Sequence, residues 1–379
     1  MSYHPVNSAD DLFMSIEFNW FLPTNGDGRH LVNSAVRNVR HGARGSRTLD
    51  LDYLIGVARS AEYAGFNAVM LPTGSMAGDG WLLAAAVAQE TSRLRLMVSF
   101  RPGLELPAYV AQKAATLQHL SGNRLLQQPV SGGSSAEQRS YGDFLGHDAR
   151  YERTAEFLDV MKAVWRGPGF THEGKYYLVD DGGLKRALEV CPPLYFGGAS
   201  QAAEKVGAEH ADVYLLWGET PPMVRERLAR TDALAAQCGR QLKYGLRLHV
   251  IARETEGEAW AEAERLLREV PQALIDIAQR QLAASESVGQ ARMRSLHQGQ
   301  TVENVRDLEV YPNLWSGVGL VRGGAGSALV GSYAQVAARI EEYVALGISS
   351  FVLSGYPNLE EALRIGEEVV PRVAAAQHA

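Results

Sequence analysis

Residues 213–252 read VYLLWGETPPMVRERLARTDALAAQCGRQLKYGLRLHVIA and contain two short apolar runs on either side of a longer amphipathic stretch. The runs Val213–Trp217 and Gly245–Ala252 have the length and composition of buried strands. The stretch between them, Pro222–Gln237, has the character of a helix. A strand, a helix and a second strand in this order predict two parallel strands that are joined by a crossover helix.

The same unit recurs along the chain. The other candidate strands are Ile16–Leu22, Ala68–Leu71, Leu94–Phe100, Arg124–Val130, Leu194–Phe196 and Ser350–Leu353. The other candidate helices are Leu51–Tyr63, Trp81–Gln89, Ala108–Leu120, Tyr151–Trp165, Gln201–Glu209 and Tyr333–Leu346. Eight strands alternating with helices predict an α/β fold of the (β/α)8 or TIM-barrel type, with insertions at its C-terminal face. A doubly wound parallel sheet is the alternative.

Charged and aromatic residues follow these strands, on the face where the active site of a barrel forms. Glycine and proline after a strand are explained by turn chemistry alone. Turn chemistry does not explain the charged and aromatic residues that cluster at the same ends, which are Arg101, Trp217, Arg247, His249 and Tyr356. The sequence therefore predicts a polar site on this face.

The segment 316–331, SGVGLVRGGAGSALVG, has Arg322 as its single charge among many glycines. Because a guanidinium stays charged and is costly to bury unpaired, this segment is interpreted as a backbone loop that aims Arg322 at an anion. An exposed arginine in a flexible loop is the alternative. The glycine spacing lacks the third glycine of a dinucleotide fingerprint, so a Rossmann site is rejected.

Arg247 and His249 alternate with apolar residues on their candidate strand, so period two places both on one face. An arginine and a histidine facing a barrel interior favour an anion-binding or acid–base role, although a structural histidine satisfied by its neighbours is the alternative. The turn Phe196–Ser200 offers glycines and a serine at a helix start, which suits phosphate, while an ordinary N-cap serine is the simpler interpretation. The histidines and cysteines show no metal-ligand spacing.

Composition narrows the class of protein. The 379 residues carry a net charge of −6, which argues against a nucleic-acid-binding surface. Two cysteines, Cys191 and Cys238, are too few for a disulfide framework and suit a reducing cytoplasm as two free thiols. No signal-peptide pattern or membrane-length apolar run is evident, so we expect neither secretion nor a membrane partner.

Three segments interrupt the regular pattern. Residues 1–14 are interpreted as an N-terminal extension to a single domain over 15–379. Residues 29–50 form a basic insertion with Arg29, His30, Arg37, Arg40, His41, Arg44 and Arg47, interpreted either as a solvated loop or as a flap over an anionic ligand or partner. Residues 254–312 are a long insertion of the kind that forms lids.

Several motifs resemble the flavin-dependent alkanesulfonate monooxygenases of the bacterial-luciferase-like superfamily. They are WFLPTNGDG (20–28), LPTG (71–74), RPG (101–103), AATL (114–117), PPLYFGG (192–198), WGE (217–219), RLHVIARE (247–254), PNLWSGVGLVRGGAG (312–326) and SGYPNLEEA (354–362). The resemblance spans about residues 16–370. It implies a luciferase-like TIM barrel that is a homodimer or a homotetramer.

The resemblance also implies the chemistry. Reduced FMN (FMNH2), delivered by a transiently bound NAD(P)H-dependent FMN reductase, reacts with O2 to give a flavin peroxide that attacks an organosulfonate, releasing sulfite and an aldehyde. The implied catalytic residues are Arg247, His249, Arg322 and Tyr356. The implied substrate-binding residues are Trp20, Asn25, Trp217, Arg247, Arg322 and Asn358. The implied cofactor-binding residues are Thr73, Ala77, Gln128, Ser131, Tyr151, Gly198, Ala199 and Ser200, of which Tyr151 and Ser200 would hold the flavin phosphate.

The sequence departs from the family pattern at four places. Asn25 and Asn358 stand where the family usually has histidine, Ala77 replaces a cysteine near the flavin, and the fourth strand ends in Gln128–Ser131 in place of an asparagine-valine-valine-threonine pattern. We interpret these changes as a sign of a more polar substrate, such as the sulfosugar sulfoquinovose. Alternatives are a sulfone monooxygenase, a deazaflavin-dependent oxidoreductase, or a barrel that binds flavin or an anion without turnover.

Overall fold

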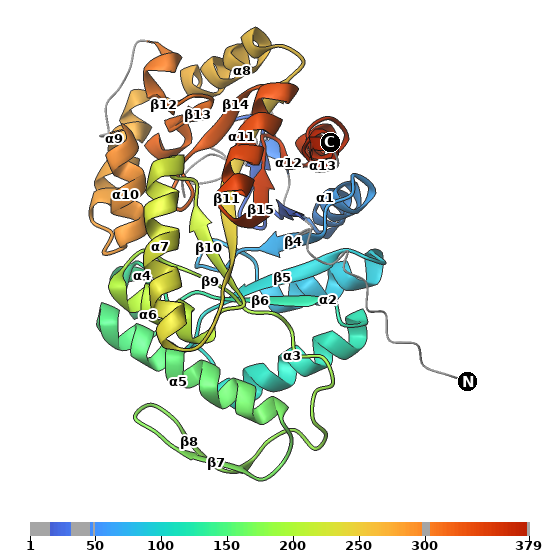
Figure 1. Cartoon of the computed structure of the whole chain (residues 1–379), viewed down its shortest axis with the longest axis vertical. Helices are drawn as coiled ribbons and strands as arrows, with labels where there is room; N and C mark the ends of the chain where they lie inside the picture. The colour runs from blue at the N-terminus through green and yellow to red at the C-terminus, as the bar shows by residue number, and fades with distance from the viewer. Residues whose placement is uncertain (1–15, 32–45, 48–49, 298–303, 377–379) are drawn as a thin grey trace.

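The computed structural model describes residues 16–31, 46–47, 50–297 and 304–376 (Figure 1). Eight of the strands in this part of the chain run parallel in the order β9-β10-β11-β15-β1-β4-β5-β6. An isolated parallel bridge between Gln127 and Leu194 links the two ends of this path. The bounds are β1 (Glu17–Phe21), β4 (Ala68–Leu71), β5 (Arg95–Phe100), β6 (Leu125–Pro129), β9 (Tyr195–Gly197), β10 (Val213–Trp217), β11 (Lys243–Arg253) and β15 (Ile348–Ser354).

Helices follow these strands and cover the outside of the sheet (Figure 1). They are α1 (Leu51–Tyr63), α2 (Gly80–Glu90), α3 (Pro107–Ser121), α4 (Ser135–Ser140), α5 (His147–Trp165), α6 (Gln201–His210), α7 (Pro221–Gln237), α11 (Tyr333–Ala345), α12 (Asn358–Glu368) and α13 (Val370–Ala376). Asp50 begins α1 by accepting a hydrogen bond from the backbone N of Tyr53, and Ser332 begins α11 with a capping box. The predicted α/β class with parallel strands is confirmed.

Because successive side chains of a strand point to opposite faces of the sheet, each strand contributes side chains to two cores. On β1, Phe18 and Trp20 pack into the layer between strands and helices, while Asn19 faces inward and donates to Ser350 Oγ at 3.0 Å. The inner layer includes Ala68, Met97, Leu126, Tyr195, Val213, Leu215 and Val352. Burying a large apolar side chain completely contributes about 1.5–3 kcal/mol, so the outer layer provides much of the stability of the fold.

The long insertion forms a helical cap at one end of the molecule (Figure 1). It contains α8 (Glu256–Arg268), α9 (Gln272–Ala283), α10 (Val288–His297), the 3-10 helix η2 (Val305–Leu308) and the strand β12 (Glu309–Tyr311). Both α9 and α10 contact the 3-10 helix η3 (Gly317–Leu320). No helix in the described residues is long and apolar enough to cross a bilayer.

The interpretation of 316–331 as a loop is wrong for its last part. Ala328–Ser332 form β14, which pairs in parallel with the second half of β11 and antiparallel with β13 (Leu314–Trp315). The 11-residue strand β11 extends beyond its neighbour β10, which leaves backbone groups that β14 satisfies. Two antiparallel pairs were not predicted from the sequence. They are the hairpin β7 (Phe170–Glu173) with β8 (Leu178–Gly182) and the short β2 (Asp27–Gly28) with β3 (Ser46–Arg47).

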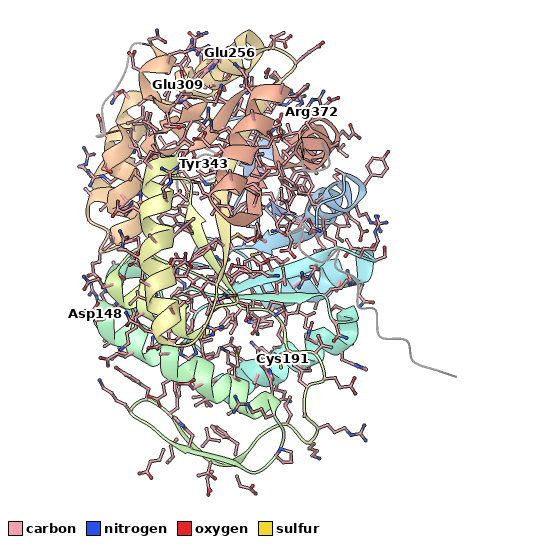
Figure 2. All side chains as sticks on the ribbon, in the orientation of Figure 1. Asp148, Cys191, Glu256, Glu309, Tyr343 and Arg372 are labelled. Carbon is pink, nitrogen blue, oxygen red and sulfur yellow. The ribbon has the colours of Figure 1, made fainter. Side chains whose placement is uncertain are left out.

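Both cysteines are exposed free thiols. Cys191 lies on the loop that leads into β9 (Figure 2).

We expect Gly207→Ala to destabilise the fold. A Cβ atom at this position of α6 would lie 2.1 Å from Cε2 of the buried Tyr214 ring, which cannot move away easily. Overpacking of this kind lowers the free energy of unfolding by about 1–3 kcal/mol. Urea unfolding followed by circular dichroism measures the change.

The matched control is Gly257→Ala on α8, where an added Cβ meets no atom within 4 Å. Its unfolding free energy should stay the same or rise by up to about 1 kcal/mol. Equal effects of the two substitutions would contradict the close packing of α6 against β10.

Candidate active site

A cavity of about 570 Å³ opens at the C-terminal ends of the parallel strands, beneath the helical cap. Residues on or just after seven of the eight strands line it, together with Gly289 and Gln290 of α10 and Arg322 to Ala325. Of the residues predicted from the sequence, it brings together Asn25, Thr73, Ala77, Gln128, Ser131, Tyr151, Gly198, Ala199, Ser200, Trp217, Arg247, His249 and Arg322.

A larger cavity, of about 800 Å³, lies at the starts of the strands. Part of its polar lining is paired, because Glu17 accepts from Tyr195 Oη at 2.7 Å and from Arg95 Nη1 at 3.4 Å. Asp212 is occupied by the backbone N of Leu194 at 2.8 Å. Barrel active sites form at the opposite end, so the smaller cavity is the candidate site despite its volume.

Arg247 and Arg322 direct their guanidinium groups to the same wall of the cavity. The Cζ atoms lie 4.8 Å and 5.3 Å from the centre of the Phe21 ring. In the part of the chain that the structure describes, no carboxylate lies within ion-pair distance of Arg247. Burial, and next the charge of Arg322, lower the pKa of Arg247 from 12.5 to about 9. This electrostatic cost falls when an anion binds between the two side chains.

His249 is held at both ring nitrogens. Nε2 lies 3.1 Å from the carbonyl oxygen of Ala325 and must carry the proton, because a carbonyl only accepts. Nδ1, 2.7 Å from Ser354 Oγ, then accepts the serine proton, while Ser354 accepts from Arg247 Nη2 at 2.9 Å. Burial and the two arginine charges lower the pKa of His249 well below its usual value. In this arrangement His249 is neutral at pH 7 and orients its neighbours.

Tyr356 lies behind the cavity wall and supports both groups. Its ring stacks on His249 with centroids 5.5 Å apart, and its hydroxyl accepts from Arg322 Nη1 at 3.0 Å. Tyr356 itself is 4% exposed and does not line the cavity. Its contacts therefore place it beside Arg322 as a support of the guanidinium.

Two predicted substrate-binding residues do not line the cavity. Trp20 is fully buried on the outward face of β1, where its Nε1 donates to the carbonyl of Asn358 at 3.1 Å. Asn358, at the start of α12, is 2% exposed and donates to Asp27 through both its backbone N and Nδ2. The alternation of β1 sends Phe21 to the cavity and its neighbour Trp20 to the helices.

The loop between β9 and α6 forms another wall. Ser200 begins α6 by accepting from the backbone N of Ala203 at 3.2 Å, and it also hydrogen-bonds with Tyr151. A Cβ at Gly198 would lie 2.4 Å from the Cβ of Ala203, so glycine is needed where the chain turns into the helix. A helix N-terminus beside two hydroxyl groups favours a phosphate.

Two further hydroxyl and amide contacts order the wall after β5 and β6. Gln128 accepts from Ser99 Oγ at 2.8 Å, and Ser131 Oγ lies 2.9 Å from Thr154 Oγ1. Arg101 also lines the cavity and donates to Glu137 at 2.6 Å. Sequence analysis noted Arg101 as a charged strand-end residue without assigning it a role, and it omitted Glu137.

The cap supplies residues that sequence analysis missed. Ser285, Ser287, Val288, Gly289 and Gln290 line the cavity, and Glu219 and Arg227 approach it from β10 and α7. The charged Glu219 of the WGE motif was a usable signal, because a carboxylate directly after a buried strand needs a partner. The residues from α10 carried no such signal, since their position depends on how the cap folds back.

The described part of the basic insertion binds acidic side chains. Arg29 lies 4.0 Å from Glu360, Arg47 forms an ion pair with the same carboxylate, and His30 pairs with Glu269. Arg37, Arg40, His41 and Arg44 lie outside the described residues. Within those residues, no group of three or more His, Cys, Asp or Glu side chains could hold a metal ion.

The lowered pKa of Arg247 predicts a pH dependence for anion binding. Its cation is present below about pH 9 and is lost above it, and only the cation attracts an anion. Sulfate does not titrate in this range, so we expect its affinity, measured by calorimetry, to be constant up to about pH 8. Above pH 9 the affinity should fall by up to about tenfold per pH unit.

Arg247→Gln should bind sulfate weakly, and its affinity should not show the additional fall above pH 9. Circular dichroism at each pH verifies that the fold persists. A wild-type affinity that stays constant from pH 7 to pH 10.5 would contradict the role of Arg247.

Known proteins share this architecture. A luciferase-like monooxygenase family model matches residues 16–350. Riboflavin lyase RcaE is 20% identical, with 96% of this chain and 92% of that chain covered and a TM-score of 0.77. EDTA monooxygenase EmoA from Chelativorans sp. BNC1 is 19% identical (96% and 94% covered, TM-score 0.74). DmoA from Hyphomicrobium sulfonivorans is 21% identical (96% and 88% covered, TM-score 0.75). The chain therefore belongs to the luciferase-like monooxygenase family.

Proposed function

We propose that this protein is a two-component flavin-dependent monooxygenase that cleaves the carbon–sulfur bond of an organosulfonate. One O2 and one reduced FMN convert R–CH2–SO3⁻ into the aldehyde R–CHO, hydrogen sulfite, water and oxidised FMN. The carbon–sulfur bond breaks, one oxygen atom enters the aldehyde, and the other leaves as water. The two electrons from the flavin complete the reduction of O2.

The observation that carries this proposal is the pair of buried arginines. Arg247 and Arg322 share one aromatic wall, and burial together with the charge of Arg322 lowers the pKa of Arg247. A sulfonate spreads one negative charge over three oxygens, and the planar fork of a guanidinium matches such an anion well. Two guanidiniums from different elements can bind two of these oxygens and leave the carbon exposed to the rest of the cavity.

The opposite wall fits FMN. Ser200, Tyr151 and the first turn of α6 would hold the phosphate, while Thr73, Ala77, Gln128 and Ser131 would border the ring system. RcaE has been solved with a modified FMN, and the oxygenating constituent of 3,6-diketocamphane monooxygenase has been solved with FMN. Bound reduced flavin supplies the activation of O2, which no amino-acid side chain provides.

The protein's own groups orient the substrate and exclude water. Arg247 and Arg322 bind the sulfonate and stabilise the charge that stays on the leaving sulfite. Tyr356 and His249 fix the position of Arg322 and of the neighbouring Ala325 carbonyl. Trp217 and α10 cover the cavity, because a Cβ added to Gly289 would lie 3.0 Å from the Trp217 ring.

The substituted residues support a polar substrate. Asn25 and Ala77 line the cavity, where the family usually has histidine and cysteine. Ser99, Ser131, Ser134, Ser285, Ser287 and Gln290 add hydroxyl and amide groups to its surface. A sulfosugar such as sulfoquinovose offers hydroxyl groups for these side chains. Asn358 is held by Asp27 and does not line the cavity, so the support for a polar substrate comes from Asn25 and from these hydroxyl and amide groups.

The reduced FMN would come from a separate NAD(P)H-dependent reductase that binds transiently. The chain would assemble as a homodimer or a homotetramer.

We expect Arg322→Ala to lower kcat/KM for sulfonate-dependent sulfite release by about 10²-fold or more, since removal of one charge-stabilising donor typically has this effect. The assay uses a generic flavin reductase, NADH and O2. Arg280→Ala is the matched control, because Arg280 is an exposed arginine on α9. Near-normal turnover in Arg322→Ala would favour another luciferase-like reaction.

Substrate choice is tested by sulfite release across alkyl, aromatic and sugar sulfonates. A polar sulfonate should react with a kcat/KM at least about tenfold above that of hexanesulfonate, because a site built to hydrogen-bond hydroxyl groups disfavours an analogue without them. Equal rates would contradict the polar substrate. Release of sulfite from none of them would contradict the proposed reaction.

A further inference from the structure

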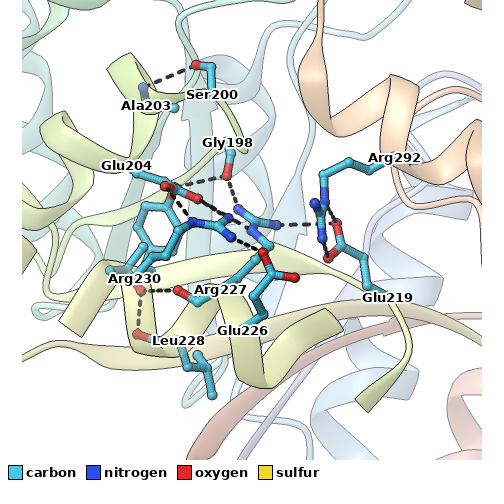
Figure 3. A network of polar contacts seen from close by, with 12 residues as sticks. Gly198, Ser200, Ala203, Glu204, Glu219, Glu226, Arg227, Leu228, Arg230 and Arg292 are labelled. Atoms are coloured by element: carbon cyan, nitrogen blue, oxygen red, sulfur yellow. Dashed lines mark hydrogen bonds and ion pairs between the residues drawn. The ribbon is translucent and has the colours of Figure 1, made fainter. Parts of the chain in front are cut away.

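Glu219, just after β10, is a buried member of an ionic network in which it joins Arg292 to Arg227 (Figure 3). The side chain is 1% exposed, and its two carboxylate oxygens accept from Nε and Nη2 of Arg292, each at 2.6 Å. Arg292 belongs to α10, so this bidentate pair fastens the cap to the barrel. Bidentate pairs of this kind are strong and directional.

Arg227 of α7 connects the same carboxylate to the β9–α6 loop. Its Nη1 lies 3.6 Å from Glu219 Oε1, and its Nη2 donates to the carbonyl of Gly198. Glu204 lies 3.7 Å from Arg227 Nε on the other side. Arg227 is 2% exposed, so its charge must be satisfied by these three neighbours.

On its other side, α10 holds the segment that carries Arg322. Gln290 Oε1 accepts from the backbone N of Gly324 at 3.0 Å. Gln279 of α9 donates to the carbonyls of Gly319 and Leu320 at 3.0 Å and 2.7 Å. Both α9 and α10 therefore help to place the backbone beside Arg322.

We propose that Glu219 is a positioning residue that couples the closed position of α10 to the Gly198–Ser200 loop. With α10 closed, Arg292 neutralises Glu219, and Arg227 is left to bond with Gly198. With α10 displaced, the unpaired Glu219 carboxylate attracts Arg227 and draws it away from the Gly198 carbonyl. A phosphate-bearing ligand at the loop and closure of α10 over Arg322 thus support each other.

The identity of the ligand as FMN rests on the proposed function, whereas the network itself does not. By linkage, if α10 closure strengthens ligand binding, then the ligand must stabilise closure by the same factor. Coupling of this kind typically amounts to about 5–150-fold.

The test compares the wild type with Arg292→Gln and Arg292→Lys. Hydrogen exchange of the α10 amides is measured with and without oxidised FMN, and FMN affinity is measured by fluorescence quenching. In the wild type, FMN should slow α10 exchange by about fivefold or more. In Arg292→Gln, α10 should exchange faster, FMN should no longer slow it, and FMN affinity should fall by about fivefold or more.

Arg292→Lys keeps the charge and loses the bidentate geometry. The slowing of α10 exchange by FMN and the FMN affinity should therefore both be partly restored. In steady-state assays, Arg292→Gln should raise the KM for reduced flavin and also lower kcat, because Arg322 loses its support. The matched control is Arg268→Gln, which removes an exposed ion pair with Glu264 on α8 and should behave as the wild type. A purely structural role for Arg292 would change α10 exchange without removing its response to FMN.

The inference is overturned if Arg292→Gln retains the FMN-induced slowing of α10 exchange, or if Arg292→Lys restores nothing. Failure of the wild type to bind FMN would instead contradict the proposed function. The coupling between α10 and the Gly198–Ser200 loop is then tested with inorganic phosphate as the probe. An absence of phosphate-dependent slowing of α10 exchange in the wild type overturns the inference.

Discussion

Two like charges on one aromatic ring set the main constraint on this structure. The guanidiniums of Arg247 and Arg322 both lie over Phe21, and both residues are buried in the wall of the cavity. Such an arrangement is unfavourable for the empty protein, because burial and next the charge of Arg322 lower the pKa of Arg247. It persists because surrounding elements fix each side chain, and an anion bound to both, as proposed, would relieve it.

Residues on or just after β11 and β15 fix these arginines. Ser354 and the Leu248 carbonyl accept from Arg247, while Tyr356 accepts from Arg322. His249 connects the surroundings of Arg247 with those of Arg322, because it contacts Ser354 through one nitrogen and the Ala325 carbonyl through the other. A histidine with both nitrogens engaged in this way is suited to hold a loop in place, and its lowered pKa keeps it neutral while it does so.

Sequence patterns predicted the regular core closely. The predicted Leu51–Tyr63, Ala68–Leu71 and Val213–Trp217 match α1, β4 and β10, because apolar periodicity and caps are local properties. The short strand β14 was predicted as a loop, because the residues before it are rich in glycine and its own apolar run is short. This run forms a strand by pairing with β11. Trp20 was placed in the site by its neighbours in a motif, although the alternation of β1 turns it toward the helices.

The sequence by itself determined the parallel α/β architecture, the shared face of Arg247 and His249, and the glycine-rich segment around Arg322. These features depend on periodicity and on the backbone freedom of neighbouring residues. Only the tertiary structure decided that Arg322 meets Tyr356, that Arg292 reaches Glu219 and that Gly289 packs on Trp217. Such contacts join residues between 34 and 73 positions apart, and their geometry depends on how the strands align and how the cap folds over them.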